Sequence, residues 1–417
     1  MRNPVVHVIG AGLAGLAAAV RLAGGTHEIV LHEAARQAGG RCRSYFDPAL
    51  GMMIDNGNHL LLSGNHDARS FLAAIGSEDQ LVGPPEADFE FIDLKSKLRW
   101  RVRPNAGPLA WWIFSNRRRV PDTGWLDYLA LLRLLVPGKD SPISAVMRCD
   151  GPLYERLWRP FLLAALNTEP SEGSSHLAAA VVRETLAKGG NACRPLVAAQ
   201  GLGAAFIEPA LNFLVERGAK ICLDHRLRRI DFAAGRATSL DFGESSLRLD
   251  PGDQVILAVP PYVARELVPG LNAPDAYRAI VNAHFKISPP DGFPAILGVV
   301  NGSIEWVFAF PDRLSVTISG ADRLLDVARE KLAEDIWAEV AEVTQIEKPL
   351  PPWQIIKEKR ATFAATVHEN AKRPEAETAY TNLVLAGDWT ATGLPATIEG
   401  AIRSGHRAAK HIRDRRK

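Results

Sequence analysis

Residues suited to binding a dinucleotide lie close to the N-terminus of the chain. Gly10, Gly12 and Gly15 form the pattern GxGxxG between a predicted strand and a predicted helix, and Glu33 ends the next predicted strand. The first glycine permits a tight turn, the second lets the backbone approach a pyrophosphate, and the third packs helix against strand. An acid at Glu33 accepts hydrogen bonds from ribose hydroxyls. The predicted contacts are Gly10, Ala11, Gly12, Leu13, Ala14, Gly15, Glu33 and Ala34.

Two further stretches indicate which dinucleotide to expect. Gly39-Gly40-Arg41-Cys42-Arg43-Ser44 resembles the GGRxxS element of flavin amine oxidases and phytoene desaturases, in which the arginine meets the pyrophosphate through its rigid fork. Gly387-Asp388-Trp389 and the segment 396–405 resemble the closing flavin motif of the same superfamily. The resemblance implies FAD, and a non-covalent cofactor is expected because no cysteine lies in the closing motif. The further contacts it implies are Gly40, Arg41, Asn56, Gly57, Asn58, Leu227, Gly387, Asp388, Thr397 and Ile398.

Strands and helices must position these motifs, and the hydrophobic pattern indicates where they lie. Residues 5–33 have the pattern of a strand, a helix and a second strand, and such a unit implies parallel strands with a right-handed crossover. The pattern also predicts a helix over 203–217, strands over 220–223, 255–259 and 383–386, and a closing helix over 396–413. The positive N-terminus of that closing helix would stabilise negative charge on a reduced flavin.

The remaining segments are typical of a second kind of domain. Residues 89–92 and 98–103 predict an antiparallel hairpin, 105–190 are mostly helical in pattern, 282–320 predict antiparallel strands and 322–345 an amphipathic helix. We therefore predict an α/β fold, in which a Rossmann-like FAD-binding domain of the amine oxidase and phytoene desaturase type is interleaved with an α+β substrate domain. The predicted FAD-binding domain takes residues 1–80, 195–262 and 355–417, and the substrate domain takes 81–194 and 263–354.

The composition excludes several classes of protein. The 417 residues include 49 basic and 47 acidic side chains, so the net charge of +2 gives no general attraction to nucleic acid. The four cysteines (Cys42, Cys149, Cys193 and Cys222) are widely spaced, so neither a disulfide framework nor a metal site is expected. This use of cysteine fits a reducing, cytoplasmic compartment. No apolar run reaches the roughly 18 residues that a membrane span needs.

More specific stretches resemble one family within that superfamily. Residues 55–62 contain DNGxH, 158–160 read WRP, 164–168 read AALNT, 358–362 read EKRAT and 392–400 read TGLPATIEG. These stretches are similar to those of the hydroxysqualene dehydroxylases, also described as squalene-associated FAD-dependent desaturases, and the likeness extends from about residue 5 to 410. One departure is Asn58, where glutamine is expected, a change that keeps an amide.

The resemblance implies that FAD is used to convert hydroxysqualene into squalene, a step toward hopanoids. Hydride would arrive from the reduced flavin, while an unidentified donor resupplies electrons. Loss of hydroxide needs a proton from a general acid or a bound water chain. His59 is the first candidate for that acid, since it titrates near neutrality, with Asp55, His284 and Asn282 as further candidate catalytic residues. For each of them a purely hydrogen-bonding, structural role is the alternative.

The aromatic and basic residues between positions 95 and 158 have two interpretations each. Trp100, Trp111, Trp112, Trp125 and Trp158 either line a pocket for a long hydrocarbon or form ordinary core. The stretch from 95 to 119 holds eight basic residues and no acidic one, with aromatics just before Arg117-Arg118-Arg119. Such a stretch suits peripheral binding to the inner face of an anionic membrane, or it contains the solvated face of the predicted hairpin.

Three other functions remain open at this stage. A carotenoid or phytoene-type desaturase would oxidise a polyene instead of reducing an alcohol. Amine oxidation is disfavoured because the sequence shows no recognisable pair of cage aromatics beside the flavin motifs. GDP-dissociation inhibitors of Rab proteins resemble this fold and bind prenyl groups without catalysis, but the intact GGR and GDW motifs favour a protein that holds flavin.

Overall fold

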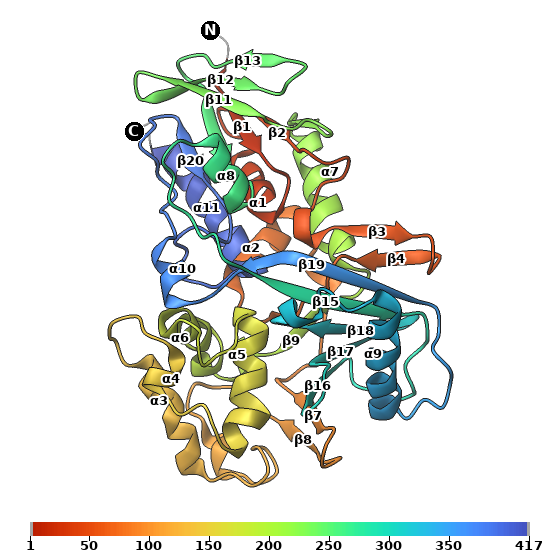
Figure 1. Ribbon diagram of the computed structural model, residues 1–417. Coiled ribbons are helices and arrows are strands. Elements are labelled where there is room, and N and C mark those ends of the chain that lie inside the picture. Colours follow the sequence, from red (N-terminus) through yellow and green to blue (C-terminus); the bar gives the residue numbers. More distant parts are fainter. Residues whose placement is uncertain (1–2, 415–417) are drawn as a thin grey trace.

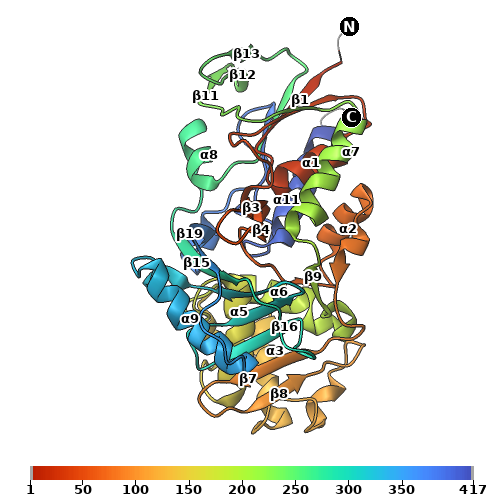
Figure 2. The same ribbon diagram turned by 90° about the vertical axis from the view of Figure 1, so that its right-hand side faces the viewer.

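Two large sheets organise the chain in the computed structural model, which describes residues 3–414 (Figure 1). A five-stranded sheet lies in the upper half of the view and a seven-stranded sheet in the lower half. The view turned by 90° keeps the same separation, and both views place the described ends of the chain beside the five-stranded sheet (Figure 2).

The five-stranded sheet is parallel and buried. Its strands, in spatial order, are β10 (Lys220–Cys222), β2 (Glu28–His32), β1 (Val5–Ile9), β14 (Gln254–Leu257) and β20 (Leu383–Leu385). The predicted βαβ unit is confirmed, because β1 pairs with β2 in parallel. Every residue of β1 is buried, as a continuous apolar run in the middle of a parallel sheet requires. β14 ends two residues earlier than predicted, before Pro260 and Pro261, the second of which begins α8 (Pro261–Leu267).

Helices from the two ends of the chain pack together against this sheet. α1 (Leu13–Leu22) contacts α11 (Ile398–Asp414), and a Cβ on Gly405 would lie 2.2 Å from the carbonyl oxygen of Ala14. A glycine at this position therefore lets the helices approach closely. α2 (His66–Ile75) and α7 (Glu208–Glu216) also contact α1. The predicted helix over 203–217 is confirmed, with its first turn, Gly203–Ile207, in π-helical form.

The seven-stranded sheet combines three separate segments of the chain, 89–102, 277–318 and 353–363. Its order is β19 (Trp353–Phe363), β15 (Tyr277–Phe285), β18 (Arg313–Ile318), β17 (Trp306–Phe310), β16 (Ile296–Val300), β7 (Phe89–Asp93) and β8 (Arg99–Val102). The predicted hairpin is confirmed as β7 and β8. The predicted domain boundary at residue 355 falls inside β19, which belongs to this sheet. α9 (Arg329–Thr344) packs on one face through a buried cluster that includes Phe285 and Trp337.

α9 begins later than the pattern over 322–345 predicts. Asp322 lies in a short 3-10 turn, Ala321–Leu324, and its carboxylate accepts a hydrogen bond from the backbone N–H of Ala279 in β15. This contact holds the chain against the sheet, so the α-helix starts only at Arg329.

Short helices lie on the side of the seven-stranded sheet away from α9 (Figure 1). They are α3 (Ala130–Leu135), α4 (Ile143–Val146), α5 (Arg159–Leu166) and α6 (Ser175–Glu184), with α10 (Val367–Ala371) nearer the C-terminus. The smaller sheets pair β3 (Ser44–Asp47) with β4 (Met52–Asp55), β9 (Pro195–Ala198) with both β5 (Leu61–Leu62) and β6 (Leu81–Val82), and β12 (Arg236–Asp241) with both β11 (Arg229–Ala233) and β13 (Ser246–Arg248). No helix within residues 3–414 is both long and apolar enough to cross a bilayer.

Candidate cofactor and substrate site

The glycine loop before α1 has the form that a phosphate requires. Gly10 has a φ of +106°, and a Cβ there would lie 2.4 Å from the carbonyl oxygen of Ala258. A Cβ on Gly15 would lie 1.9 Å from the Gly10 oxygen, whereas one on Gly12 would meet nothing within 4 Å. The first and third glycines are thus required by packing, and the second faces open space. Because the first turn of α1 holds no acidic residue and no capping side chain, its N–H groups can receive an anion.

Glu33 joins the glycine loop to the loop that follows β2. Its Oε2 accepts a hydrogen bond from the Ala11 N–H at 2.7 Å, and its Oε1 accepts one from the Ala35 N–H at 2.9 Å. A carboxylate oxygen has lone pairs for more than one donor. The carboxylate is therefore held in place by the backbone with capacity left for ribose hydroxyls. The predicted contact Ala34 is exposed beside it.

Arg41 and Asp388 bring the two ends of the sequence to one point. The guanidinium Nη2 of Arg41 lies 2.6 Å from Oδ2 of Asp388, and its Nη1 donates to the carbonyl oxygen of Ala361 at 2.5 Å. Ala361 lies where the register of β19 against β15 shifts, and such a bulge leaves a carbonyl free for another partner. The Arg41 side chain is 43% exposed and that of Asp388 is 7% exposed. One edge of the guanidinium thus remains accessible to a phosphate.

The N-terminus of α11 is also available to a ligand. Thr397 Oγ1 accepts a hydrogen bond from the N–H of Gly400 at 3.0 Å. Glu399, the acid in the first turn, points away and accepts hydrogen bonds from the N–H groups of Asp67 and Ala68 at the start of α2. The positive end of α11 near Thr397 and Ile398 is consequently not occupied by its own carboxylate. Gly387 is anchored nearby, because its N–H donates to Ser404 Oγ at 2.8 Å.

Asn282 connects the segment after β4 to the seven-stranded sheet. Its Nδ2 donates to the carbonyl oxygen of Asn56 and its Oδ1 accepts from the N–H of Asn58, both at 3.4 Å. Thr317 Oγ1 donates to the same Oδ1 at 2.8 Å. A Cβ on Gly57 would lie 3.1 Å from Asn282 Nδ2. The predicted cofactor contacts Asn56, Gly57 and Asn58 therefore gather around the predicted catalytic residue Asn282.

Asp55 and His284 are engaged in hydrogen bonds beneath that segment. Asp55 Oδ1 accepts from Ser44 Oγ at 2.5 Å and from the Leu202 N–H at 2.9 Å, and burial raises the pKa of this carboxyl. His284 contacts Ser315 Oγ through Nδ1 at 2.8 Å and the Asp55 carbonyl oxygen through Nε2 at 3.1 Å. Burial lowers the pKa of His284 to about 3, so its neutral ring satisfies both partners. Both side chains hold the segment in place.

Burial shifts the pKa values of His59 and Glu305 in opposite directions. Burial, followed by the charge of Arg41, lowers the pKa of His59 to about 4, and the imidazole is uncharged at pH 7. Burial raises the pKa of Glu305 to about 7, and its Oε2 accepts from the Ser319 N–H at 2.8 Å. Sequence reasoning missed Glu305, because it lies in a loop before β17 that carries no motif.

A row of side chains crosses the seven-stranded sheet from Asn282 to its outer edge. Residues paired directly across neighbouring strands point to the same face. The register pairs Asn282 with Thr317, Thr317 with Trp306, Trp306 with Gly298, Gly298 with Phe91 and Phe91 with Trp100. We call these residues the Asn282–Trp100 row. The row connects the predicted cofactor segment to an aromatic surface.

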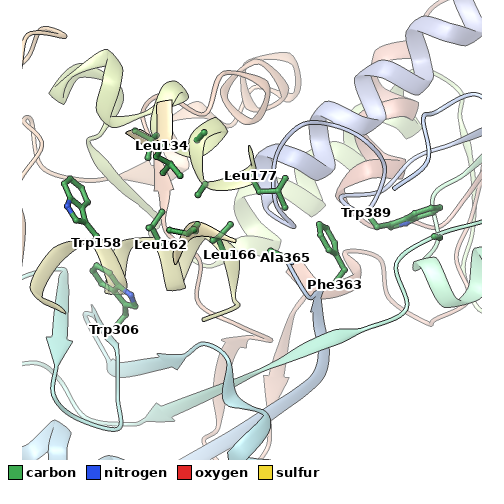
Figure 3. Packing of buried hydrophobic residues seen from close by; sticks show 14 of the residues in the cluster. Leu134, Trp158, Leu162, Leu166, Leu177, Trp306, Phe363, Ala365 and Trp389 are labelled. Carbon is green, nitrogen blue, oxygen red and sulfur yellow. The ribbon is translucent and has the colours of Figure 1, made fainter. Parts of the chain in front are cut away.

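The row adjoins a buried apolar cluster that extends to the C-terminal motif. In Figure 3, Trp158 and Trp306 lie on one side, Leu162 and Leu166 of α5 follow, and Phe363 and Trp389 lie on the other side. The same cluster contains Trp100 and Trp112, whereas Trp111 and Trp125 are exposed. The five tryptophans between positions 100 and 158 are therefore divided between interior and surface.

One predicted cofactor contact and one cluster that was not predicted lie in the segment beside the end of β2. The predicted contact Leu227 is buried just before β11. His32, Cys222 and His225 are brought together with their ligand atoms within 4.8 Å of one another, a cluster that their spacing in the sequence did not indicate. Burial lowers the pKa of His32 to about 3, and its Nδ1 lies 2.9 Å from Nδ1 of His225. An N–H···N hydrogen bond between the two rings accounts for this contact.

Comparisons with known proteins identify relatives over the full length of the chain. Residues 13–413 match the model of the flavin containing amine oxidoreductases. The hydroxysqualene dehydroxylase of Rhodopseudomonas palustris is 56% identical over 408 residues, which cover 98% of both chains, and that of Sinorhizobium fredii is 54% identical over 97% of both. Among solved structures, cyclohexylamine oxidase from Brevibacterium oxydans matches with a TM-score of 0.70 at 16% identity, covering 99% of each chain. This last likeness shows the fold.

Proposed function

The chain belongs to the hydroxysqualene dehydroxylases within the flavin containing amine oxidoreductases, and we propose that it uses FAD to reduce hydroxysqualene to squalene. It is a flavin-dependent oxidoreductase with the α/β fold of the amine oxidases. The observation that carries the proposal is the contact of Arg41 with Asp388, which joins the two flavin motifs beside the glycine loop.

FAD fits the residues that surround this contact. We propose that the glycine loop and α1 hold the pyrophosphate together with Arg41, that Glu33 holds the ribose, and that the α11 N-terminus receives the flavin. Non-covalent binding is supported by Cys42, the cysteine beside Arg41, because burial raises the pKa of its thiol to about 12. We assign the five-stranded sheet and its helices to the FAD-binding domain, and the seven-stranded sheet, including β19, to the substrate domain.

The reaction replaces a hydroxyl group by hydrogen. FAD, when bound and reduced, would supply the hydride that takes the place of the hydroxyl group, and a proton would join the departing oxygen so that water leaves. An apolar surrounding favours this chemistry because it excludes water from the charged carbon, and the Asn282–Trp100 row provides one. We propose Glu305, whose pKa is raised to about 7 by burial, as the proton source, since a neutral His59 is a much weaker acid than a protonated one.

Anaerobic turnover tests the proposal directly. Purified holoenzyme is reduced chemically and mixed with hydroxysqualene, and the formation of squalene is followed by mass. Phytoene, offered to the oxidised enzyme, tests the desaturase alternative, which has weaker support because the probable zeta-carotene desaturase of Synechococcus elongatus is 22% identical. Conversion of phytoene alone would overturn the proposal. A colourless protein that takes up no FAD would favour a non-catalytic prenyl-binding function.

We propose further that the protein binds peripherally to an anionic membrane. Of the thirteen large apolar side chains that are exposed in the described chain, eight lie between positions 109 and 136. They form an exposed apolar surface made of Leu109, Trp111, Phe114, Trp125, Leu126, Leu129, Leu132 and Val136. Phe114 is central, with ring centroids 6.2 Å from Trp111 and 5.7 Å from Trp125. An apolar patch of this kind marks an interaction surface.

The charges around this surface favour a bilayer with anionic headgroups. Arg117 and Arg133 form no ion pair within residues 3–414, whereas the nearby Asp122 pairs with Arg156 at 2.9 Å. The arginines of the hairpin do not contribute in the same way, because Arg101 and Arg103 pair with Asp88, which directly precedes the neighbouring strand β7. Basic residues near an anionic surface contribute about 1 kcal/mol each, and aromatic side chains insert at the interface.

Vesicle co-sedimentation tests the membrane proposal. Vesicles that contain anionic phospholipid are expected to sediment the wild-type protein, and purely zwitterionic vesicles to sediment less of it. The combined change Trp111→Ser and Phe114→Ser is expected to abolish binding, and Arg117→Ser with Arg118→Ser to weaken it. Val215→Ser, an exposed apolar residue of α7, is the control. Binding that survives both pairs of changes would exclude this surface as the membrane contact.

A further inference from the structure

Among the buried side-chain polar atoms that have no hydrogen-bond partner within the described chain, two belong to residues beside Thr317 of the Asn282–Trp100 row. They are the indole Nε1 of Trp306, a donor, and the amide Oδ1 of Asn58, an acceptor. Both residues are 7% exposed. Leaving such an atom unsatisfied costs about 1–3 kcal/mol, so native proteins rarely bury one without a ligand or water to meet it.

The two atoms belong to residues that both neighbour Thr317. Trp306 is the direct strand neighbour of Thr317, at the spacing of about 4.8 Å between strands. Asn58 contacts the same threonine, because its Nδ2 donates to Thr317 Oγ1 at 3.3 Å and to the Val316 carbonyl oxygen at 3.4 Å. A carbonyl oxygen can only accept, so this contact identifies the amide nitrogen and leaves Oδ1 as the free end.

Thr317 itself is not the group that a ligand would use as a donor. Its hydroxyl donates to Asn282 Oδ1 at 2.8 Å, and its oxygen accepts from Asn58. Asn282, Thr317 and Asn58 therefore satisfy one another through their side chains, except for the amide oxygen of Asn58. The indole N–H of Trp306, the strand neighbour of Thr317, is also left without a partner among the described residues. One donor and one acceptor are the complement of a single hydroxyl group, which both accepts and donates.

The surroundings of Trp306 are otherwise apolar on this face. Phe91 meets Trp306 edge to face with ring centroids 5.7 Å apart, and stacks on Trp100 at 5.5 Å. Gly298 makes this possible, because a Cβ there would lie 2.4 Å from a ring carbon of Phe91. A hydrocarbon chain along the row thus meets aromatic rings, and a hydroxyl group on it finds its partners beside Thr317.

We infer that Trp306 Nε1 and Asn58 Oδ1 bind the hydroxyl group of an aliphatic alcohol, the indole N–H donating to its oxygen and its O–H donating to the amide oxygen. The inference rests on the proposed function, which supplies the alcohol. The pair distinguishes hydroxysqualene from squalene, because the product lacks the group and leaves both protein atoms unpaired. A site built around a hydroxyl rejects an analogue without it far more strongly than an apolar pocket does.

Binding measurements on the oxidised holoenzyme test the inference without turnover. The dissociation constants of hydroxysqualene and squalene are measured for the wild type and for Trp306→Phe, which removes the N–H and keeps an aromatic ring. The wild type is expected to prefer hydroxysqualene by about tenfold to a hundredfold. Trp306→Phe is expected to lose about tenfold of this preference and to bind squalene as before. Asn58→Leu, which removes the amide oxygen, is the second variant and is expected to lower the same preference. Because Asn58 is also a predicted cofactor contact, its flavin content is measured alongside.

Trp100→Phe is the matched control. Its indole nitrogen also has no partner within the described residues, and it lies on the same row at the outer edge of the sheet. The preference is expected to survive this change. A Trp306→Phe enzyme that keeps the preference, or that loses both ligands equally, overturns the inference while wild-type turnover still supports the proposed function. A reduced wild-type enzyme that forms no squalene refutes the proposed function itself.

Discussion

The Arg41–Asp388 pair predicts an asymmetry between two substitutions. Arg41→Met leaves the Asp388 carboxylate, 7% exposed, with no other side-chain hydrogen bond among the described residues. Removing one partner of a buried ion pair costs about 3–5 kcal/mol, and we expect about 3 kcal/mol of unfolding free energy to be lost. Asp388→Leu leaves Arg41, which is 43% exposed and still bonded to the Ala361 carbonyl, so about 1 kcal/mol is expected.

Urea unfolding of the flavin-free protein measures both losses and their coupling. The double variant Arg41→Met with Asp388→Leu removes both charges of the pair, and we expect it to be more stable than Arg41→Met alone because the Asp388 carboxylate is no longer left buried without Arg41. Flavin titration of the same proteins reports the separate loss of the phosphate ligand. Equal losses for the two single variants, or a double variant as unstable as their sum, would refute the claim that Asp388 depends on Arg41.

Two further outcomes follow from the structure. Gly405→Ala places a Cβ 2.2 Å from the Ala14 oxygen and is expected to cost about 1–3 kcal/mol in thermal unfolding, whereas Gly107→Ala, with nothing within 4 Å, is the neutral control. Burial raises the pKa of Glu305 from 4.5 to about 7, so the folded protein keeps a proton that the unfolded chain releases. The stability that this residue contributes is therefore lost as the pH rises from 4.5 to 7, and turnover is expected to fall above pH 7. The variant Glu305→Gln should remove both pH trends. An unchanged pH profile in that variant would contradict the assignment of Glu305 as the proton source.

The nucleotide-binding half of the molecule was predictable because its signals are local. A glycine that needs a positive φ, as Gly10 does, and a helix that begins directly after it appear within a few residues of sequence. The contact between Arg41 and Asp388 is long-range, yet it followed from the resemblance of both motifs to one superfamily. The late start of α9 was missed, because a long-range hydrogen bond of Asp322 sets it, and β14 ends two residues short of the proline pair at which it was predicted to stop.

The substrate half was not predictable in the same way, because it depends on strand register. The segment 282–320 was expected to form antiparallel strands, and it does. Nothing in that pattern pairs Trp306 with Thr317, or Gly298 with Phe91 from a segment far away in the sequence. A shift of one residue in any strand would move its side chains to the other face, so the row exists only in the folded sheet.

β19 shows how the two halves are held in one geometry. At its register shift, the Ala361 carbonyl binds Arg41, and Ile356 farther along the same strand lies opposite Asn282. At about 3.3 Å per residue the two positions are roughly 17 Å apart, and no loop separates them. One continuous strand thus positions both Arg41, the proposed pyrophosphate ligand, and the start of the Asn282–Trp100 row. We expect a residue inserted between Ile356 and Ala361 to move Arg41 relative to the proposed hydroxyl-binding pair, so that the rate of turnover falls more than the affinity for either cofactor or substrate.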